Sequence, residues 1–518
     1  MWFFNTIDKR LVIILVLYLV LGLALLGYYQ YQINPDGVGY IQTAWKYLSG
    51  DFYGAVNAYW GPLLSWLLIP FLYFNQNPDY ALYSAKILSL ILGFFTIMGV
   101  RQLSYRFEMD ETVRTAVLLM MVPVLIYFAL SVVTPDLLVA CVLVYYLSII
   151  FNPKYPDKLS NGLVCGALGA VAFFAKSFLF PFFIAQFLVL NLLHYHYRGD
   201  YPWIKITRNM LMGFLVFLLI SGVWIGLISS KEGELTFGTS GGYNHALVGP
   251  ESSGFPQFYQ GLSAPGEIDQ QKALKEWSPF ESWSNFTFQL RLIWNNLWQT
   301  ISIYQFFSCL SVLIILSSLF LLLRPFKKFT GKGDRRIIIF SLITLLIYSG
   351  GYLPVLVEDR YLWPIYLLLM LMGGLLISLT FKNLPAWKTN YVNILKGVII
   401  ILFALSFILM PVNFLNTNID TGKDIYALSD TLKTQYGVQG NIATNDRLID
   451  AQFLSFYLNT TSFGQSKKDI SDAELQLQLE KYRIDYYLVW GNSTPHLTSY
   501  KEITGGKIRD LKIYRRNF

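Results

Sequence analysis

Charged residues are scarce in this sequence. Asp, Glu, Lys and Arg make up only 14% of its 518 residues, whereas 54% are hydrophobic. A composition this apolar excludes an ordinary soluble globular protein. The net charge of +8 does not indicate a nucleic-acid partner, because the basic residues cluster in short loops between apolar runs. That distribution is typical of membrane proteins.

Cysteine is also rare, and the common catalytic motifs are missing. Cys141, Cys165 and Cys309 lie in apolar stretches without metal-ligand spacing, so we expect small buried hydrophobic residues. His194 and His196 are two positions apart and do not share a helical face, which argues against a metal pair. The sequence has no Walker-type glycine loop, dinucleotide fingerprint or Ser-His-Asp arrangement, so nucleotide-driven chemistry is not supported.

Long apolar runs, in contrast, are abundant. They have the length needed to cross a hydrocarbon core of about 30 Å. The first run follows Lys9 and Arg10 and predicts a retained signal-anchor. Because Lys and Arg concentrate in alternate loops, we place the N-terminus in the cytoplasm and the C-terminus outside. About eleven transmembrane helices are predicted, near 11–29, 83–101, 114–132, 137–151, 161–175, 177–193, 209–229, 302–323, 337–354, 361–380 and 397–414.

This topology predicts two domains. Residues 1–415 form a transmembrane domain with external loops 30–82 and 230–301, and residues 416–518 form a soluble extracytoplasmic domain. The apolar run Pro62–Phe74 in the first external loop is too short to cross a bilayer, so we expect an interfacial segment.

Two further patterns describe the external regions. The second external loop ends in the aromatic stretch Phe280–Thr300, which suits a helix lying in the headgroup layer. In the tail, helical patterns at Ile425–Tyr436 and Asp472–Tyr482 alternate with short strand-like runs, which predicts a small α/β domain. These runs are Asn441–Thr444, Tyr486–Trp490 and Leu511–Tyr514. The predicted fold is therefore a polytopic α-helical membrane protein with a small extracytoplasmic α/β domain.

Four of the few charges fall at the same predicted membrane face: Asp36, Asp136, Lys176 and Arg360. An ammonium and a guanidinium group both suit phosphate oxygens. A carboxylate at the membrane surface can take a proton from an attacking nucleophile. Lys86, near the start of the second span, is a weaker third cation. The convergence predicts a site for a phosphate-bearing substrate.

The two carboxylates also have structural interpretations. Asp36 lies in the turn-forming sequence Asn34-Pro35-Asp36-Gly37 and could cap a helix that follows from about Tyr40. Asp136, in Thr134-Pro135-Asp136, completes a well-formed helix start. Neither residue alone therefore indicates catalysis.

The two cations have structural alternatives as well. Lys176 interrupts an apolar run and could snorkel from the tip of a helical hairpin instead of meeting an anionic partner. Arg360 could form a local salt bridge with Glu358 or Asp359.

With these motifs the chain resembles the type C glycosyltransferase superfamily, in particular its protein mannosyltransferase-like and aminoarabinose transferase-like branch (families 39 and 83). The resemblance covers most of residues 1–415. The matching features are Asp-x-x-x-Tyr in the first external loop (Asp36, Tyr40), Thr-Pro-Asp-x-Leu opening the fourth span (Asp136), a lysine in a Gly-rich hairpin (Lys176) and Arg-Tyr-x-x-Pro opening a late span (Arg360, Tyr361).

The resemblance implies a membrane glycosyltransferase that uses a sugar on a polyprenyl phosphate, outside the cytoplasm and without a nucleotide. The sugar would pass to a lipid, glycan or protein acceptor by inverting displacement, in a bacterial inner membrane. The residues implied or expected at the site are Asp36 and Asp136 as catalytic carboxylates, and Lys176, Arg360, Tyr40, Lys86 and Tyr361 around the substrate phosphate.

The first loop departs from the family pattern. Aminoarabinose transferases carry Glu-Lys-Pro-Pro where this chain has Tyr59-Trp60-Gly61-Pro62, so a sugar or acceptor preference is not carried over from them. The loop has no Asp-x-Asp, and a divalent metal is possible but not indicated. Two alternatives remain: a ligase moving a glycan from a lipid diphosphate, which would use the same cations, and a lipid or glycan transporter without chemistry.

Overall fold

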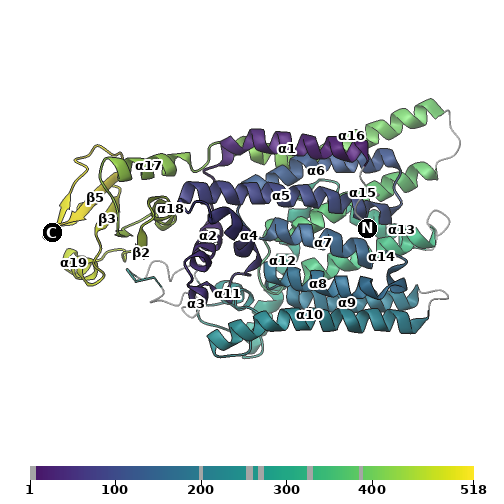
Figure 1. Cartoon of the computed structure of the whole chain (residues 1–518), viewed down its shortest axis with the longest axis horizontal. Helices are drawn as coiled ribbons and strands as arrows, with labels where there is room; N and C mark the ends of the chain where they lie inside the picture. The colour runs from purple at the N-terminus through teal and green to yellow at the C-terminus, as the bar shows by residue number, and fades with distance from the viewer. Residues whose placement is uncertain are drawn as a thin grey trace.

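The computed structural model describes residues 8–197, 202–252, 261–265, 274–323, 331–383 and 389–517. Most helices run along the long axis of the molecule, and a small sheet lies at one end, beside the C-terminus (Figure 1). The predicted fold class, a polytopic helical membrane protein with a small mixed α/β tail, is confirmed.

Sixteen α-helices precede the tail in the described residues. They are α1 (Lys9–Tyr29), α2 (Pro35–Leu48), α3 (Phe52–Ala55), α4 (Leu63–Leu72), α5 (Pro78–Ser104), α6 (Glu111–Ser131), α7 (Asp136–Ile150), α8 (Leu159–Ala175), α9 (Leu179–His196), α10 (Trp203–Glu232), α11 (Ser240–Leu247), α12 (Trp283–Phe307), α13 (Ser311–Leu322), α14 (Lys332–Gly350), α15 (Trp363–Lys382) and α16 (Thr389–Thr417).

The long apolar helices differ in how much of their surface the protein covers. The span that contains α15 is 94% buried over its most apolar part, whereas α10 and α16 are 28% buried. A helix that is apolar all round and exposed on most of its surface suits contact with lipid, whereas α15 forms the centre of the bundle.

Seven helices in the described ranges are long and apolar enough to cross a membrane, or eight if the bent pair α12 and α13 is one span. The helices α7 and α8 are shorter, with 15 and 17 residues. The predicted number of eleven crossings and their orientation therefore stay predictions.

The continuous span predicted at 302–323 is wrong. The helix α12 runs on to Phe307, and α13 starts at Ser311 with a bend of 104° between them. At the break, the Ser308 hydroxyl donates to the Ser406 hydroxyl of α16 and accepts from the Leu310 main-chain N–H, one of the backbone donors that the start of α13 leaves open.

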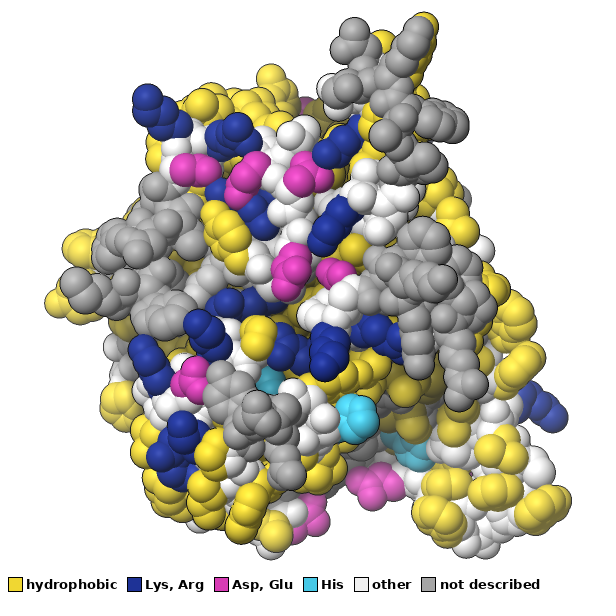
Figure 2. Space-filling model, turned by 90° about the vertical axis from the view of Figure 1, so that its right-hand side faces the viewer, with side chains coloured by type: hydrophobic (Ala, Val, Ile, Leu, Met, Phe, Trp, Pro, Cys, Tyr) yellow, Lys and Arg dark blue, Asp and Glu magenta, His cyan; other side chains and the backbone are white. Residues whose placement is uncertain are grey.

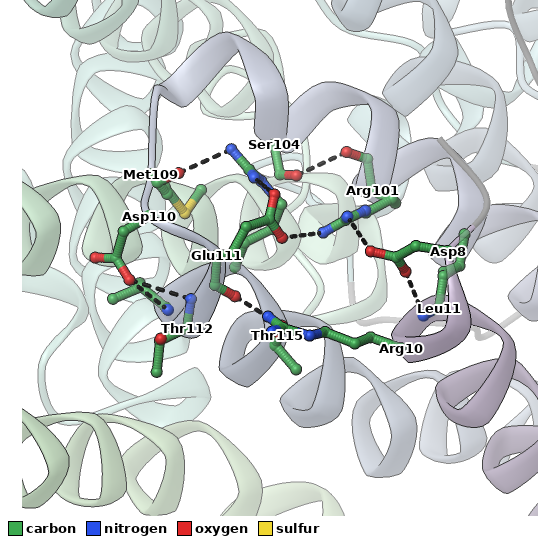
Figure 3. A network of polar contacts seen from close by, with 12 residues as sticks. Asp8, Arg10, Leu11, Arg101, Ser104, Met109, Asp110, Glu111, Thr112 and Thr115 are labelled. Carbon is green, nitrogen blue, oxygen red and sulfur yellow. Dashed lines mark hydrogen bonds and ion pairs between the residues drawn. The ribbon is translucent and has the colours of Figure 1, made fainter. Parts of the chain in front are cut away.

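The end of the molecule opposite the sheet is rich in Lys and Arg side chains, with several Asp and Glu among them (Figure 2). The sequence predicts that this end faces the cytoplasm. Here the buried Arg101 at the end of α5 bridges Asp8, the N-cap of α1, at 2.8 Å and Glu111 of α6 at 3.0 Å (Figure 3). Arg114 pairs with the same Glu111. The network fastens the ends of three helices together.

The tail contains five strands and three helices. The helices are α17 (Lys423–Thr434), α18 (Leu448–Leu458) and α19 (Asp472–Lys481), and the strands are β1 (Asn441–Thr444), β2 (Thr461–Gln465), β3 (Tyr486–Trp490), β4 (Tyr500–Glu502) and β5 (Leu511–Arg516). The sheet order is β2-β1-β3-β5-β4, with β1 parallel to β2 and β3, and β5 antiparallel to β3 and β4. The boundary of a separate domain at residue 416 stays a prediction.

The tail packs on α2 and on Tyr31, at the start of the loop predicted to be external. The Phe456 ring of α18 stacks on Trp45 of α2 with 5.7 Å between centroids. Tyr426 of α17 stacks on Tyr31 at 4.4 Å, and the Tyr457 hydroxyl donates to the Tyr31 carbonyl. The tail therefore contacts α2, the helix that carries Asp36.

Candidate active site

The first turn of α2 places Asp36. The helix begins at Pro35, whose fixed φ suits the first helical position, and Asn34 is its N-cap. It starts about one turn earlier than expected from the sequence, so Asp36 is a first-turn residue and not a cap. Asp36 and Tyr40 are four positions apart and share one helical face, which explains the Asp-x-x-x-Tyr spacing.

Asn34 joins the two segments that carry the carboxylates. Its Oδ1 accepts a hydrogen bond from the main-chain N–H of Val133 at 2.9 Å, three residues before Asp136. A Cβ at Gly37 would lie 2.9 Å from the Cβ of Val133, so only glycine permits this approach. The Asn-Pro-Asp-Gly sequence thus holds α2 against the start of α7.

Asp136 forms an ion pair with Lys176. Lys176 follows the last residue of α8, at the tip of the α8–α9 hairpin, and its Nζ lies 2.8 Å from Asp136 Oδ1. The Asp136 side chain is 4% exposed and that of Lys176 is 18% exposed. Burial lowers the pKa of Lys176, and the nearby Asp136 carboxylate opposes that shift. Lys176 therefore has a carboxylate partner instead of snorkelling to water.

Arg360 lies between two carboxylates, in the short 3-10 turn directly before the helix α15. Its NH1 nitrogen is 2.7 Å from Asp36 Oδ2, and its Nε is 2.7 Å from Glu358 Oε2. The local salt bridge considered from the sequence is thus present, with Glu358, together with a long-range pair to Asp36. Asp359 instead accepts a hydrogen bond from the Tyr127 hydroxyl at 3.2 Å.

An aromatic surface brings the two ion pairs together. Lys176 Nζ lies 3.5 Å from the ring centroid of Tyr361 and 5.5 Å from that of Tyr352, and the two rings stack on each other. The Arg360 guanidinium lies 5.4 Å from the same Tyr361 ring. Both cations therefore meet one tyrosine, whose negative ring face favours positive charge.

Tyr40 of α2 packs against Trp60, close to the two carboxylates. Its side chain is buried, and burial together with the charges of Asp36 and Asp136 raises its pKa well above the ordinary tyrosine value. Burial and Asp36 also raise the pKa of Tyr59. Both phenols are therefore neutral and able to donate a hydrogen bond.

Lys86 lies apart from the other six predicted residues. It is fully buried inside α5, and its ammonium donates to the main-chain carbonyl of Leu130 at 2.5 Å. That carbonyl is at the C-terminal end of α6, where the helix dipole is negative. The expectation of a surface cation relied on a span starting at 83, whereas α5 starts at Pro78 and places Lys86 deeper.

Two cavities are lined in part by residues that precede the cations in the sequence. One has a volume of about 690 Å³ and is lined almost wholly by apolar side chains, among them Tyr47, Trp66, Phe174 and Trp224. Phe174 is two residues before Lys176. The other cavity, of about 530 Å³, is lined by α12 residues together with Val357, Glu358 and Asp359, directly before Arg360.

The cluster holds three carboxylates and two cations. The third carboxylate is Glu358, which the sequence suggested only as a local salt-bridge partner of Arg360. Tyr352 and Asn34 were missed, because neither residue type signals chemistry without a known partner. Within the described ranges, no three His, Cys, Asp or Glu side chains gather in a way that would hold a metal ion.

Comparisons with known proteins show which solved structures have a similar fold. No protein-family model matches the chain, and a search with the sequence among curated proteins gives no match. The structure of ArnT from Cupriavidus metallidurans bound to undecaprenyl phosphate matches with a TM-score of 0.55, 14% identity, and coverage of 96% of this chain and 97% of that chain. The apo state of the same protein matches with a TM-score of 0.54 at 15% identity, covering 96% and 97% of the two chains.

A more distant match has the same architecture. The apo oligosaccharyltransferase from Archaeoglobus fulgidus gives a TM-score of 0.53 at 10% identity, covering 93% of this chain and 69% of that chain. The chain therefore shares its fold with ArnT and with the archaeal oligosaccharyltransferase, and the resemblance predicted from the sequence is confirmed at the level of the fold.

Proposed function

We propose that the chain is a multi-pass membrane glycosyltransferase that moves a sugar from a polyprenyl phosphate to an acceptor. The observation that carries this proposal is the pairing of two cations, Lys176 and Arg360, over one tyrosine ring. An apolar cavity is lined in part by Phe174, two residues before Lys176. The cations suit a phosphate group, and the cavity suits an isoprenoid chain. The likeness to ArnT, seen with bound undecaprenyl phosphate, supports the same assignment.

Asp36 is the base in this mechanism. Its side chain is 31% exposed, whereas that of Asp136 is 4% exposed and bonds to Lys176. An acceptor can therefore reach Asp36 more easily than Asp136. Asp136 holds Lys176 in place, and this positions the ammonium for the phosphate.

The transfer is a single displacement. The acceptor oxygen or nitrogen attacks the anomeric carbon, the bond from that carbon to the phosphate oxygen breaks, and the acceptor proton passes to Asp36. The prenyl phosphate leaves with the bonding electrons, and Lys176 and Arg360 stabilise the charge that grows on it. The configuration at the anomeric carbon is inverted.

The site lies at the end of the bundle that faces the tail (Figure 1). If the basic end is cytoplasmic, the reaction takes place outside the cytoplasm, and a bacterial inner membrane is the proposed location. The tail contacts α2, the helix that carries Asp36, through Trp45.

Transfer from radiolabelled polyprenyl-phosphate sugars in proteoliposomes tests the function. We expect the wild type to transfer at least one sugar and Asp36→Asn to lower turnover about 10²–10⁴-fold, the contribution of a general base. The matched control is Asp359→Asn, which changes a neighbouring carboxylate that bonds to Tyr127 and should retain most turnover. Equal turnover in wild type and Asp36→Asn would remove Asp36 as the base.

Transfer of a whole glycan from a lipid diphosphate, with no transfer from any monophosphate sugar, would favour the ligase. Movement of the lipid across the bilayer without transfer would favour the transporter.

A further inference from the structure

The ion pairs at the site create a chemical conflict. Arg360 NH1 occupies Oδ2 of Asp36, the oxygen atom of a proposed base, and Lys176 is bonded to Asp136. A base acts through a free oxygen lone pair, and a phosphate needs free donors on the two cations. In this paired arrangement Oδ2 of Asp36 and Nη1 of Arg360 are bonded to each other, so neither atom can bond to a substrate.

The two pairs differ in how easily they can separate. Asp136 is 4% exposed, so breaking its bond to Lys176 would leave a buried carboxylate without a partner. Asp36 is 31% exposed and lies in the first turn of a helix, where the dipole favours a negative charge. The Asp36–Arg360 contact is therefore the one that a competing anion can replace at lower cost.

Glu358 limits how many nitrogens of Arg360 can bond to Asp36. It holds the Nε of the guanidinium at 2.7 Å, so Arg360 meets Asp36 through a single nitrogen and not through two. A bidentate guanidinium–carboxylate pair is stronger than a single bond. The observed arrangement therefore keeps the contact with Asp36 replaceable while Arg360 stays near the aromatic ring of Tyr361.

We propose that this contact is a donor-sensitive interlock: the phosphate of the lipid-linked donor displaces Asp36 from Arg360, and this frees Oδ2 of the carboxylate to take the proton of the acceptor. The donor then binds before the acceptor is activated. The inference rests on the proposed function, because it takes the phosphate of a polyprenyl donor as the competing anion.

A binding measurement tests the interlock without a sugar or an acceptor. The full chain is placed in nanodiscs, and its affinity for polyprenyl monophosphate is measured for the wild type, Asp36→Asn, Arg360→Gln and the double variant. If Asp36 competes with phosphate for Arg360, Asp36→Asn should bind about tenfold more tightly, a difference of about 1.4 kcal/mol. In the Arg360→Gln background the same change should have an effect of less than about threefold.

Asp359→Asn is the matched control, because it removes a neighbouring charge that bonds to Tyr127 and not to a cation. Its affinity should stay within about twofold of the wild type. If Asp36→Asn fails to fold, as judged by size-exclusion chromatography and thermal unfolding, Asp36→Ser removes the same charge and carries the same test.

The outcomes separate the two proposals. Unchanged or weaker binding by Asp36→Asn overturns the interlock and leaves the function intact. Equal tightening in the Arg360→Gln background, or by Asp359→Asn, also overturns it, because the effect is then one of general charge. If the wild type and every variant fail to bind polyprenyl monophosphate, the proposed function falls, and the interlock falls with it.

Discussion

The close approach of Gly61 to the α8–α9 hairpin gives a sharp test of the site geometry. A Cβ built at Gly61 lies 2.4 Å from the carbonyl oxygen of Phe174 and 2.7 Å from that of Ala175. Ordinary Cβ contacts begin at 3.4 Å, and the opposing atoms are backbone, which cannot rotate away. The variant Gly61→Ala must therefore move the first loop and the hairpin apart by about 1 Å.

This movement acts on the residue next along the chain. Lys176 directly follows Ala175, and its Nζ is held 2.8 Å from Asp136. A misplacement of about 1 Å at a reacting group can cost about 100-fold in rate. The strain should also destabilise the protein by about 1–3 kcal/mol, the usual effect of overpacking.

The assay compares Gly61→Ala with Gly27→Ala for binding of polyprenyl monophosphate, for sugar transfer and for thermal unfolding. Gly27 has no heavy atom within 4 Å of a built Cβ and lies inside the helix α1, where alanine is preferred to glycine. We expect Gly27→Ala to retain binding and transfer, and Gly61→Ala to lose both in large part. Wild-type binding, transfer and unfolding temperature in Gly61→Ala would refute the proposed packing of the loop on the hairpin.

Three further predictions follow from single contacts. Burial lowers the pKa of Lys176, so the ammonium loses its charge at a pH below the ordinary lysine value of about 10.4. Binding of polyprenyl monophosphate should therefore weaken as pH rises through that range. The variant Lys176→Arg should remove this decline, because a guanidinium keeps its charge. Arg101→Ala should lower the free energy of unfolding, measured with denaturant, by about 1–3 kcal/mol. The loss stays in this range because the two carboxylates left behind are half-exposed and can bind water. The control Arg10→Ala removes an exposed side chain and should change the free energy of unfolding little. Phe456→Ala removes a buried ring at the contact of tail and bundle and should cost about 3–5 kcal/mol, against a small change for Phe280→Ala, which is 90% exposed.

Much of the fold could be predicted because it depends on local pattern. The strands β1 and β3 begin and end at the predicted residues, and β5 begins at Leu511 as expected. The strand β2 was missed, since Thr461–Gln465 has only one strongly apolar residue and forms through pairing with β1. Pairing across a sheet is tertiary information that a short segment does not carry.

The partners within the candidate site could not be predicted in the same way. Charge and topology place Asp36, Asp136, Lys176 and Arg360 at one face, but not which cation meets which carboxylate. That pairing depends on close backbone approaches, such as that of Gly37 to Val133. For Lys86 the error was in the start of the helix. The helix α5 begins a few residues earlier than predicted, so the Lys86 side chain lies in the interior and not at the surface.

The short helices beside the site have a consequence for the surrounding lipid. With a rise of 1.5 Å per residue, the 15 residues of α7 span about 22 Å and the 17 residues of α8 about 26 Å. In the predicted topology both helices cross the membrane. Because both fall short of a hydrocarbon thickness of about 30 Å, the polar ends that carry Asp136 and Lys176 would then be recessed or the adjoining leaflet thinned. A lipid phosphate would then meet the two cations below the mean headgroup plane. Turnover should therefore depend on acyl-chain length, falling in bilayers of long-chain lipids, where the mismatch is greater.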